Sequence, residues 1–293
     1  MSRETETLRL LKTLLGLYRP SNVEVRRLAD VARLNKLLLA YLRMVGDVLR
    51  DELISEETRY RRFMRNAAEV IEALNSIGVS YALHKFRKPF EHVSVDLDIL
   101  VRVDDIPKAV EVLIRRGFKV AVSEPYTATL IRRGFIVDLY TNPSFAWVVY
   151  MDGEKLLRCC VEEIEVSGVR TNALSREAEV VVAAAHAIYK EHMVLLIDCL
   201  TAWAWASREA WSLAERLGAG KALKAFHSIC RAIGAGYAEA PYRLSIGATT
   251  KILSKKLVED PVFRATTINI VKYILRHRDI GTRILSRLLR ESY

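Results

Sequence analysis

The chain has 293 residues, of which 51% are apolar, and a net charge of +10. This length and apolar content allow two domains, or one domain with helical additions, around a sizeable buried core. The positive charge favours polyanionic partners such as nucleic acid or nucleotide phosphates, and a solvated arginine-rich helical surface explains it equally well.

The sequence argues against export and against a membrane span. At the amino terminus, charged residues precede any apolar run, which is not the pattern of a signal peptide. The longest apolar stretch, residues 180–206, is interrupted by Lys190, Glu191 and Asp198, which favours a buried helix pair over a membrane helix. We therefore expect a cytoplasmic protein without a membrane segment.

The first 77 residues are predicted to be helical. Leucines recur at helical spacing over residues 8–15, and Pro20 with Ser21 breaks this segment. Ser21 or Asn22 is placed to cap the next helix, which an apolar stripe predicts over residues 23–49. A third helix is expected over residues 56–77, ending near Gly78.

From Gly78 the pattern changes to a mixed α/β block. Short β-like runs at 79–83 and 93–103 precede a helix at 106–116, which Gly117 closes. Further strands are expected at 119–123, 127–131 and 135–141, followed by a hairpin at 164–169 with Gly168 in its turn. We expect an α+β fold in which flanking helices pack on this small mixed sheet.

The remainder of the chain is predicted to be helical. Ser175 is a good N-cap for the first of these helices, because Glu177 and Glu179 follow in its first turns. The expected organisation is an N-terminal helical region (residues 1–77), a core (78–172) and a C-terminal helical domain (173–293).

The cysteines show no metal-binding pattern. The four residues, Cys159, Cys160, Cys199 and Cys230, form no CxxC pair and no zinc spacing. Because Cys159 and Cys160 are adjacent, we do not expect them to bridge each other. All four are predicted to be reduced thiols.

Two aspartates in the strand at 93–103 carry the main chemical signal. Side chains alternate along a strand, so Asp96 and Asp98 point to one face while Leu97 and Ile99 point to the other. Two carboxylates about 7 Å apart along a strand repel each other unless a cation lies between them. Mg²⁺ prefers such oxygen ligands and leaves positions for phosphate. An Asp-x-Asp pair also arises by chance, and acidic residues at strand ends often only face water.

A third carboxylate follows about forty residues later. Asp138 interrupts the otherwise apolar strand at 135–141, where a lone charge is costly unless it is paired or metal-bound. If this strand lies beside the Asp96 strand, Asp138 can complete a three-carboxylate site or accept a proton from an attacking hydroxyl.

These pieces together resemble the nucleotidyltransferase superfamily related to DNA polymerase β, and most closely its uncharacterised prokaryotic or archaeal branch. The resemblance rests on Asp-Leu-Asp-Ile-Leu-Val from Asp96, on Gly117-Phe118, and on Val-Asp-Leu-Tyr around Asp138, and it covers residues 78–141. It implies a nucleotidyltransferase core in which Asp96, Asp98 and Asp138 hold Mg²⁺ or Mn²⁺.

One departure from the family pattern concerns phosphate binding. Members of the superfamily place a glycine-containing turn before the Asp-x-Asp strand, but this chain has no glycine between Gly78 and Gly117. Lys85, Arg87 and Lys88 lie at that place and are the candidates to hold the nucleotide phosphates by side-chain charge. A solvated basic turn is the alternative.

Other candidates carry weaker signals. His186 lies in an apolar helical run and is more typical of a core histidine than of a metal ligand. Asp198 is expected to form a structural ion pair. Trp203, Trp205 and Trp211 are interpreted as packing residues, with base stacking by one of them left open. The basic and aromatic residues 59–63 fit either a nucleic-acid surface or a helix face whose side chains extend to solvent.

The resemblance implies Mg²⁺-dependent transfer of a nucleoside monophosphate from an NTP to a hydroxyl acceptor. RNA, such as a tRNA end, is the favoured acceptor, because residues 242–293 carry 11 Lys/Arg against 4 Asp/Glu and are expected to bind phosphate. A protein hydroxyl or a small molecule is the other acceptor that the sequence leaves open. The alternative is a catalytically degenerate relative that binds nucleic acid or a partner protein.

Overall fold

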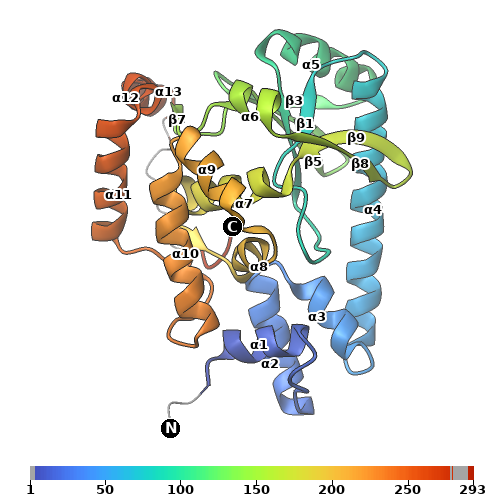
Figure 1. Ribbon diagram of the computed structural model, residues 1–293. Coiled ribbons are helices and arrows are strands. Elements are labelled where there is room, and N and C mark those ends of the chain that lie inside the picture. The colour runs from blue at the N-terminus through green and yellow to red at the C-terminus, as the bar shows by residue number, and fades with distance from the viewer. Residues whose placement is uncertain (1–3, 278, 280–289) are drawn as a thin grey trace.

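The computed structural model describes residues 4–277, residue 279 and residues 290–293. It has N-terminal helices, a central mixed sheet and C-terminal helices, which confirms the α+β prediction (Figure 1). None of the helices in this described part is long and apolar enough to cross a membrane.

The N-terminal helices follow the predicted pattern, except that one predicted helix is divided in two and that the last of them begins at Arg50 rather than at residue 56. They are α1 (Glu6–Leu14), α2 (Asn22–Leu34), α3 (Leu38–Val45) and α4 (Arg50–Asn75). Ser21 caps α2 and forms a capping box with Glu24. The single helix predicted over residues 23–49 is wrong, because the backbone turns at Lys36, which has a left-handed φ of 56°. The apolar stripe continues across this break, so periodicity alone did not reveal it.

A seven-stranded sheet forms the centre of the molecule, in the order β3-β4-β5-β2-β1-β9-β8. Its strands are β1 (Tyr81–Leu83), β2 (Asp96–Val101), β3 (Lys119–Glu124), β4 (Thr127–Arg132), β5 (Phe135–Tyr140), β8 (Val161–Val166) and β9 (Val169–Leu174). β2 pairs with β5 in parallel, and β1 pairs with β9 in parallel, while the other neighbours are antiparallel. The strands predicted from alternation are all present.

Helices cover both faces of the sheet. On one face, α4 and α5 (Ile106–Arg115) pack on Leu97, Ile99 and Val137 and on their buried neighbours. On the other face, Leu100 and Tyr140 join a larger core that also contains α6 (Gly153–Cys159) and α7 (Arg176–Ala185). These helices bury Leu100 and Tyr140 on that face, whereas Asp96 and Asp138, on the same face of β2 and β5, are only half-buried.

The remaining elements complete the helical part. They are a 3₁₀ helix (Val103–Asp105), β6 (Ser144–Phe145), β7 (Val148–Val149), a π-helical stretch (His186–Glu191), β10 (Met193–Val194), α8 (Leu196–Trp205), α9 (Arg208–Arg216), α10 (Gly220–Gly234), β11 (Tyr242–Arg243), α11 (Ile246–Glu259), α12 (Pro261–Thr266) and α13 (Asn269–Arg276). Ser175 caps α7 as predicted. Helices α1 to α3 share one apolar core with α7, α8 and α10, so the N-terminal helices pack against helices of the C-terminal half below the sheet (Figure 1).

The predicted reduced thiols are wrong in this structure. Cys199 on α8 and Cys230 on α10 form a disulfide, with Cα atoms 5.2 Å apart. The adjacent Cys159 and Cys160 are also joined, at the end of α6. Cysteine spacing along the chain could not show the first pair, because helix packing brings its two members together.

Candidate active site

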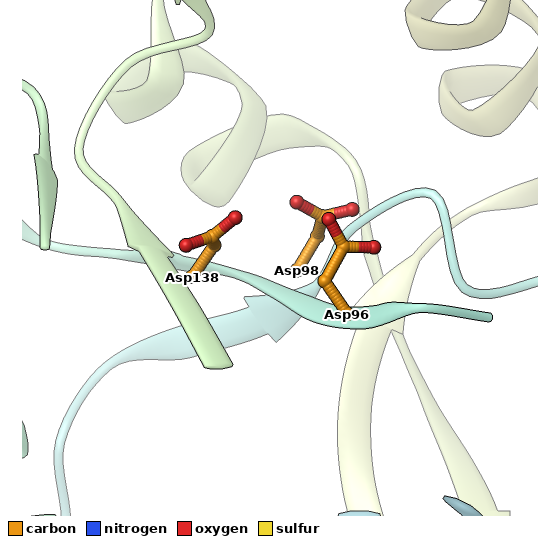
Figure 2. A group of neighbouring side chains, drawn as sticks. All are labelled: Asp96, Asp98 and Asp138. Carbon is orange, nitrogen blue, oxygen red and sulfur yellow. The ribbon is translucent and has the colours of Figure 1, made fainter. Parts of the chain in front are cut away.

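Asp96, Asp98 and Asp138 converge on one face of the sheet. Because β2 and β5 are parallel neighbours, Asp98 lies directly opposite Asp138, and Asp96 lies two residues earlier on the same face. One carboxylate oxygen from each residue lies within 4.8 Å of the others (Figure 2). The expectation that the three carboxylates meet is therefore confirmed.

The alternation that exposes the carboxylates also anchors them. Leu97 and Ile99 are 1% and 0% exposed on the opposite face, within the core under α4 and α5. Shifting β2 by one residue would move these two side chains out of the core, so their burial fixes the register of the aspartates. Asp98 is itself buried, and Asp96 and Asp138 are half-buried.

Asp98 has one cationic partner and one unsatisfied oxygen. The Nζ atom of Lys85 lies 2.7 Å from Oδ2 of Asp98, and the Lys85 side chain is only 18% exposed. The other oxygen, Oδ1, is buried without a hydrogen-bond partner in the described part of the chain. An unsatisfied buried carboxylate oxygen is costly, so this atom is suited to a ligand that supplies positive charge.

Asp138 is held by its neighbours on the sheet. The hydroxyl of Thr129 donates to its Oδ1 at 2.5 Å, and the hydroxyl of Tyr140 donates to its Oδ2 at 3.4 Å. Burial raises the pKa of Asp138, the Thr129 hydrogen bond opposes this, and the charges of Asp98 and Asp96 raise it further. A carboxylate with a raised pKa is a better proton acceptor near neutral pH.

The charge and donor set fit a divalent metal ion. Three carboxylates carry −3, and the Lys85 ammonium contributes +1, which leaves −2 at the cluster. Carboxylate oxygens are the ligands that Mg²⁺ and Mn²⁺ prefer. Coordination of such an ion would also satisfy the buried Oδ1 of Asp98, which has no hydrogen-bond partner in the described part of the chain.

The basic turn after β1 is built around Lys85. Its φ of 60° lies in the left-handed region, which glycine adopts most easily. The conformation that a glycine turn provides is thus present here without glycine. Lys85 lies beside Asp98, Arg87 contacts Glu162 at 2.5 Å, and Lys88 lies 3.5 Å from Asp198.

Four lysines and the three carboxylates line one cavity of about 310 Å³. Lys85 and Lys88 were candidates from the sequence, and Lys36 and Lys190 were not. Burial lowers the pKa of Lys36, and the nearby charge of Lys85 lowers it further. No sequence signal distinguishes Lys36 or Lys190 from other lysines, because separate helical segments bring them to the cavity.

A second cavity of about 290 Å³ shares Lys85 and Lys88 of the basic turn with the lysine-rich cavity. It also reaches Asp96 and Asp98, and Arg87 lines it. Its aromatic lining consists of Tyr60, Phe63, Phe86, Phe90 and Trp205. The two cavities therefore differ in chemistry, one being rich in lysine and the other rich in aromatic rings.

The secondary candidates have structural partners. His186 is buried, with Nε2 3.4 Å from a Glu191 carboxylate oxygen, and burial lowers its pKa well below the usual value. Asp198 forms the expected ion pair, with Lys88, and accepts a hydrogen bond from the Tyr293 hydroxyl. These contacts agree with the structural roles predicted for His186 and Asp198.

Glu179 positions the basic turn and was not singled out from the sequence. This residue of α7 is 0% exposed, and its Oε1 accepts hydrogen bonds from the backbone N–H groups of Phe86, at 3.2 Å, and Arg87, at 3.5 Å. Burial raises the pKa of Glu179 to about 7, against the opposing charge of Lys88 and these hydrogen bonds.

The raised pKa of Glu179 predicts a specific pH dependence of stability. The pKa of Glu179 in the folded protein, about 7, exceeds its usual value of 4.5. The contribution of the protonated Glu179 side chain to the free energy of unfolding is therefore full below pH 4.5 and is lost as pH rises through 7. Between pH 5 and pH 8 the loss is about 2 to 3 kcal/mol. Urea unfolding at pH 5 and pH 8 gives the fall in the free energy of unfolding between these two pH values. In Glu179→Gln this fall should be about 2 to 3 kcal/mol smaller than in the wild type. The control Glu177→Gln, in the same helical turn, should keep the wild-type difference, and an unchanged difference in Glu179→Gln would contradict the assignment.

Comparison with known proteins agrees with the geometry of this site. No curated protein matches the chain. A family described as uncharacterised nucleotidyltransferase matches residues 25–233, a range that includes the three carboxylates, the basic turn and Lys36. This match extends over most of the chain, so the protein belongs to that uncharacterised nucleotidyltransferase family.

Proposed function

We propose that the protein transfers a nucleoside monophosphate from an NTP to a hydroxyl acceptor, with pyrophosphate as the leaving group. The observation that carries this proposal is the convergence of Asp96, Asp98 and Asp138 from two parallel strands on one point. A chance Asp-x-Asp pair does not require a third carboxylate from another strand. Family membership supports the same class of reaction.

In this proposal, Asp96, Asp98 and Asp138 hold Mg²⁺ or Mn²⁺. When bound, the ion would supply positive charge to oxygens that become more negative during transfer. Asp138 also orients the acceptor hydroxyl and accepts its proton, which agrees with its half-buried position and raised pKa. Lys85 balances part of the carboxylate charge before substrate binds.

The lysine-lined cavity is the proposed site of the triphosphate. Lys85 and Lys88 of the basic turn, Lys36 and Lys190 come from three separate segments and line a space that the three carboxylates also line. Ammonium groups form charge-assisted hydrogen bonds with phosphate oxygens, although Lys85 and Lys88 also pair with Asp98 and Asp198. Arg87 remains a candidate phosphate ligand from the neighbouring cavity, although Glu162 already binds it.

The aromatic cavity is suited to the nucleotide base. Its rings offer stacking surfaces within reach of the same two aspartates, Asp96 and Asp98. Trp205 is the tryptophan that lines it. Base stacking is therefore assigned to this cavity.

Binding and transfer assays distinguish this proposal from the catalytically degenerate alternative. Calorimetry with each NTP in the presence of Mg²⁺ should give binding, and a degenerate relative should bind neither ligand. Incubation with labelled NTPs, Mg²⁺ or Mn²⁺, and RNA should then transfer label to the RNA. If the protein binds neither nucleotide nor metal, the proposed transfer activity is wrong. The alternative of a catalytically degenerate relative that binds nucleic acid or a partner protein would then apply.

Mg²⁺ should raise the thermal stability of the protein through the three carboxylates. At a concentration about 100 times the Kd, a bound ion adds about 2.7 kcal/mol, which corresponds to an increase in Tm of about 5 °C. Asp138→Ala should lose part of that increase. The control Asp104→Ala removes a carboxylate whose side chain is 75% exposed and should respond to Mg²⁺ as the wild type does. Scanning fluorimetry with Mg²⁺ and with EDTA measures the difference. An Asp138→Ala response equal to the control would exclude Asp138 as a ligand.

A further inference from the structure

A strongly basic groove borders the carboxylate site. Its volume is about 980 Å³, and it runs between α4, the segment before β2, the start of β3 and the β4–β5 turn. Seven Arg or Lys side chains line it, against one carboxylate, Glu69. Such an excess of one charge creates a local field that attracts polyanions.

Most of this charge is not neutralised within the protein. Glu69 already binds Arg132, at 2.5 Å. Five other basic side chains of the groove are exposed and form no ion pair with a carboxylate in the described residues; they are Arg62, Arg65, Arg116, Lys119 and Arg133. The groove therefore offers cations that a solvent-exposed anion can reach.

The groove is continuous with the active site. Ser94 and Val95 line both the groove and the lysine-rich cavity, and the hydroxyl of Ser94 lies 3.4 Å from Oδ1 of Asp96. The sheet gives a second connection. Thr129 pairs with Asp138, and Ile131 lies two residues later on the same face, opposite Lys119. Ile131 and Lys119 line the groove, so two of its lining residues lie on the sheet face that carries Asp138.

Arg133 occupies a position that local backbone preference does not favour. It and Gly134 form the two-residue turn between β4 and β5, with φ values of 50° and 78°. Turns of this kind favour Asn-Gly, because both central residues need positive φ. The turn places Arg133 in the lining of the groove, and asparagine would adopt its backbone conformation more easily.

We propose that this groove binds the sugar-phosphate backbone of a single nucleic-acid strand and leads its terminal hydroxyl to the carboxylates. The inference rests on the proposed nucleotidyl transfer for the role of the strand as acceptor. A strand end fits this site best, because Asp98 is buried and the lysine-rich cavity, at about 310 Å³, is smaller than the groove, at about 980 Å³. Exposed arginines on a rigid helix and turn bind phosphates without reading base sequence.

This location differs from the one expected from charge counts. Residues 242–293 are also basic, but α11 and α13 lie on the side of the molecule opposite α4 (Figure 1). The two basic regions can therefore be tested separately with equal changes of net charge.

The test compares two triple charge reversals. The groove variant is Arg62→Glu with Arg65→Glu and Arg133→Glu, and the control is Lys251→Glu with Lys255→Glu and Lys272→Glu, three exposed lysines of α11 and α13. Fluorescence anisotropy measures binding of a labelled single-stranded RNA of about 16 nucleotides and of DNA of matching sequence. The groove variant should bind the strand about tenfold or more weakly than the wild type. The slope of its log affinity against log salt concentration should be smaller by about 2, and the affinity of the control should change less than about threefold. The RNA and DNA arms show which sugar is preferred.

A single substitution separates a binding role of Arg133 from a structural one. Arg133→Asn should raise Tm by about 2 °C, because asparagine adopts positive φ more easily, and should weaken strand binding about threefold. A merely structural arginine would not give opposite changes in these two measurements. A fall in Tm, or unchanged strand affinity, would contradict the assignment.

Further outcomes separate the groove from the catalytic proposal. No strand binding by the wild type at low salt, or an equal or larger loss in the control, would overturn the groove assignment. Loss of NTP binding in the groove variant would also overturn it, because the groove would then hold nucleotide. If the wild type binds strands through the groove but binds no NTP, the proposed transfer fails while the groove assignment stands.

Discussion

Replacing Asp96 with asparagine should lower nucleotidyl transfer by about a thousandfold or more, which is about 4 kcal/mol of transition-state stabilisation. Asp96 is the best single residue to change, because the Lys85 ion pair involves Asp98 and stays intact. Asparagine removes one of three mutually repelling charges, so the metal-free protein should keep or gain stability. Transfer of labelled nucleotide and urea unfolding in EDTA measure the two effects.

Two comparisons make the Asp96 result decisive. Asp104→Asn, an exposed carboxylate beyond the site, should leave transfer unchanged. The double variant Asp96→Asn with Asp98→Asn should also be inactive, but it leaves the buried Lys85 ammonium without its partner and should therefore lose stability. More than about a tenth of wild-type activity in Asp96→Asn would contradict the metal assignment.

Lys85→Met should have the largest effect on the stability of the metal-free protein. Removing the ammonium takes away the cation paired with Asp98, whereas Lys88, the other lysine of this turn, pairs with Asp198 instead. Breaking a buried ion pair in this way costs about 3 kcal/mol. Mg²⁺ should then raise Tm more in Lys85→Met than in the wild type, because the ion supplies the missing charge.

A double-mutant cycle tests this explanation. Lys85→Met and Asp98→Asn should each destabilise the metal-free protein, and the double variant should be less destabilised than their sum by about 1 to 3 kcal/mol. Urea unfolding in EDTA supplies the four free energies. Additive effects would show that the 2.7 Å contact contributes no coupling, and the charge balance proposed for the site would then be wrong.

Local patterns in the sequence determined much of the fold. Alternation along β2 placed Asp96 and Asp98 on the face opposite Leu97 and Ile99, and those two apolar side chains are buried as expected. Ser21 and Ser175 cap helices where they were predicted to do so. Such features depend on residues only a few positions apart, so the sequence alone reveals them.

Local patterns did not predict where a helix is interrupted by a residue with a left-handed backbone conformation. The apolar stripe over residues 23–49 gave no sign of the left-handed residue Lys36, which divides it into α2 and α3. The same irregularity brings Lys36 to the lysine-rich cavity. Periodicity showed neither the break at Lys36 nor its place in the lining of that cavity.

The sequence by itself determined the identity of the three carboxylates, the faces they occupy on their strands and the family that they indicate. Only the tertiary structure decided that β2 and β5 are parallel neighbours with Asp98 opposite Asp138, that Lys85 pairs with Asp98, and that the basic groove reaches Ser94. It also decided the Cys199–Cys230 bond. The physical reason is range: side-chain alternation and helix capping act between near neighbours, whereas strand order, ion pairs and grooves depend on how the whole core packs.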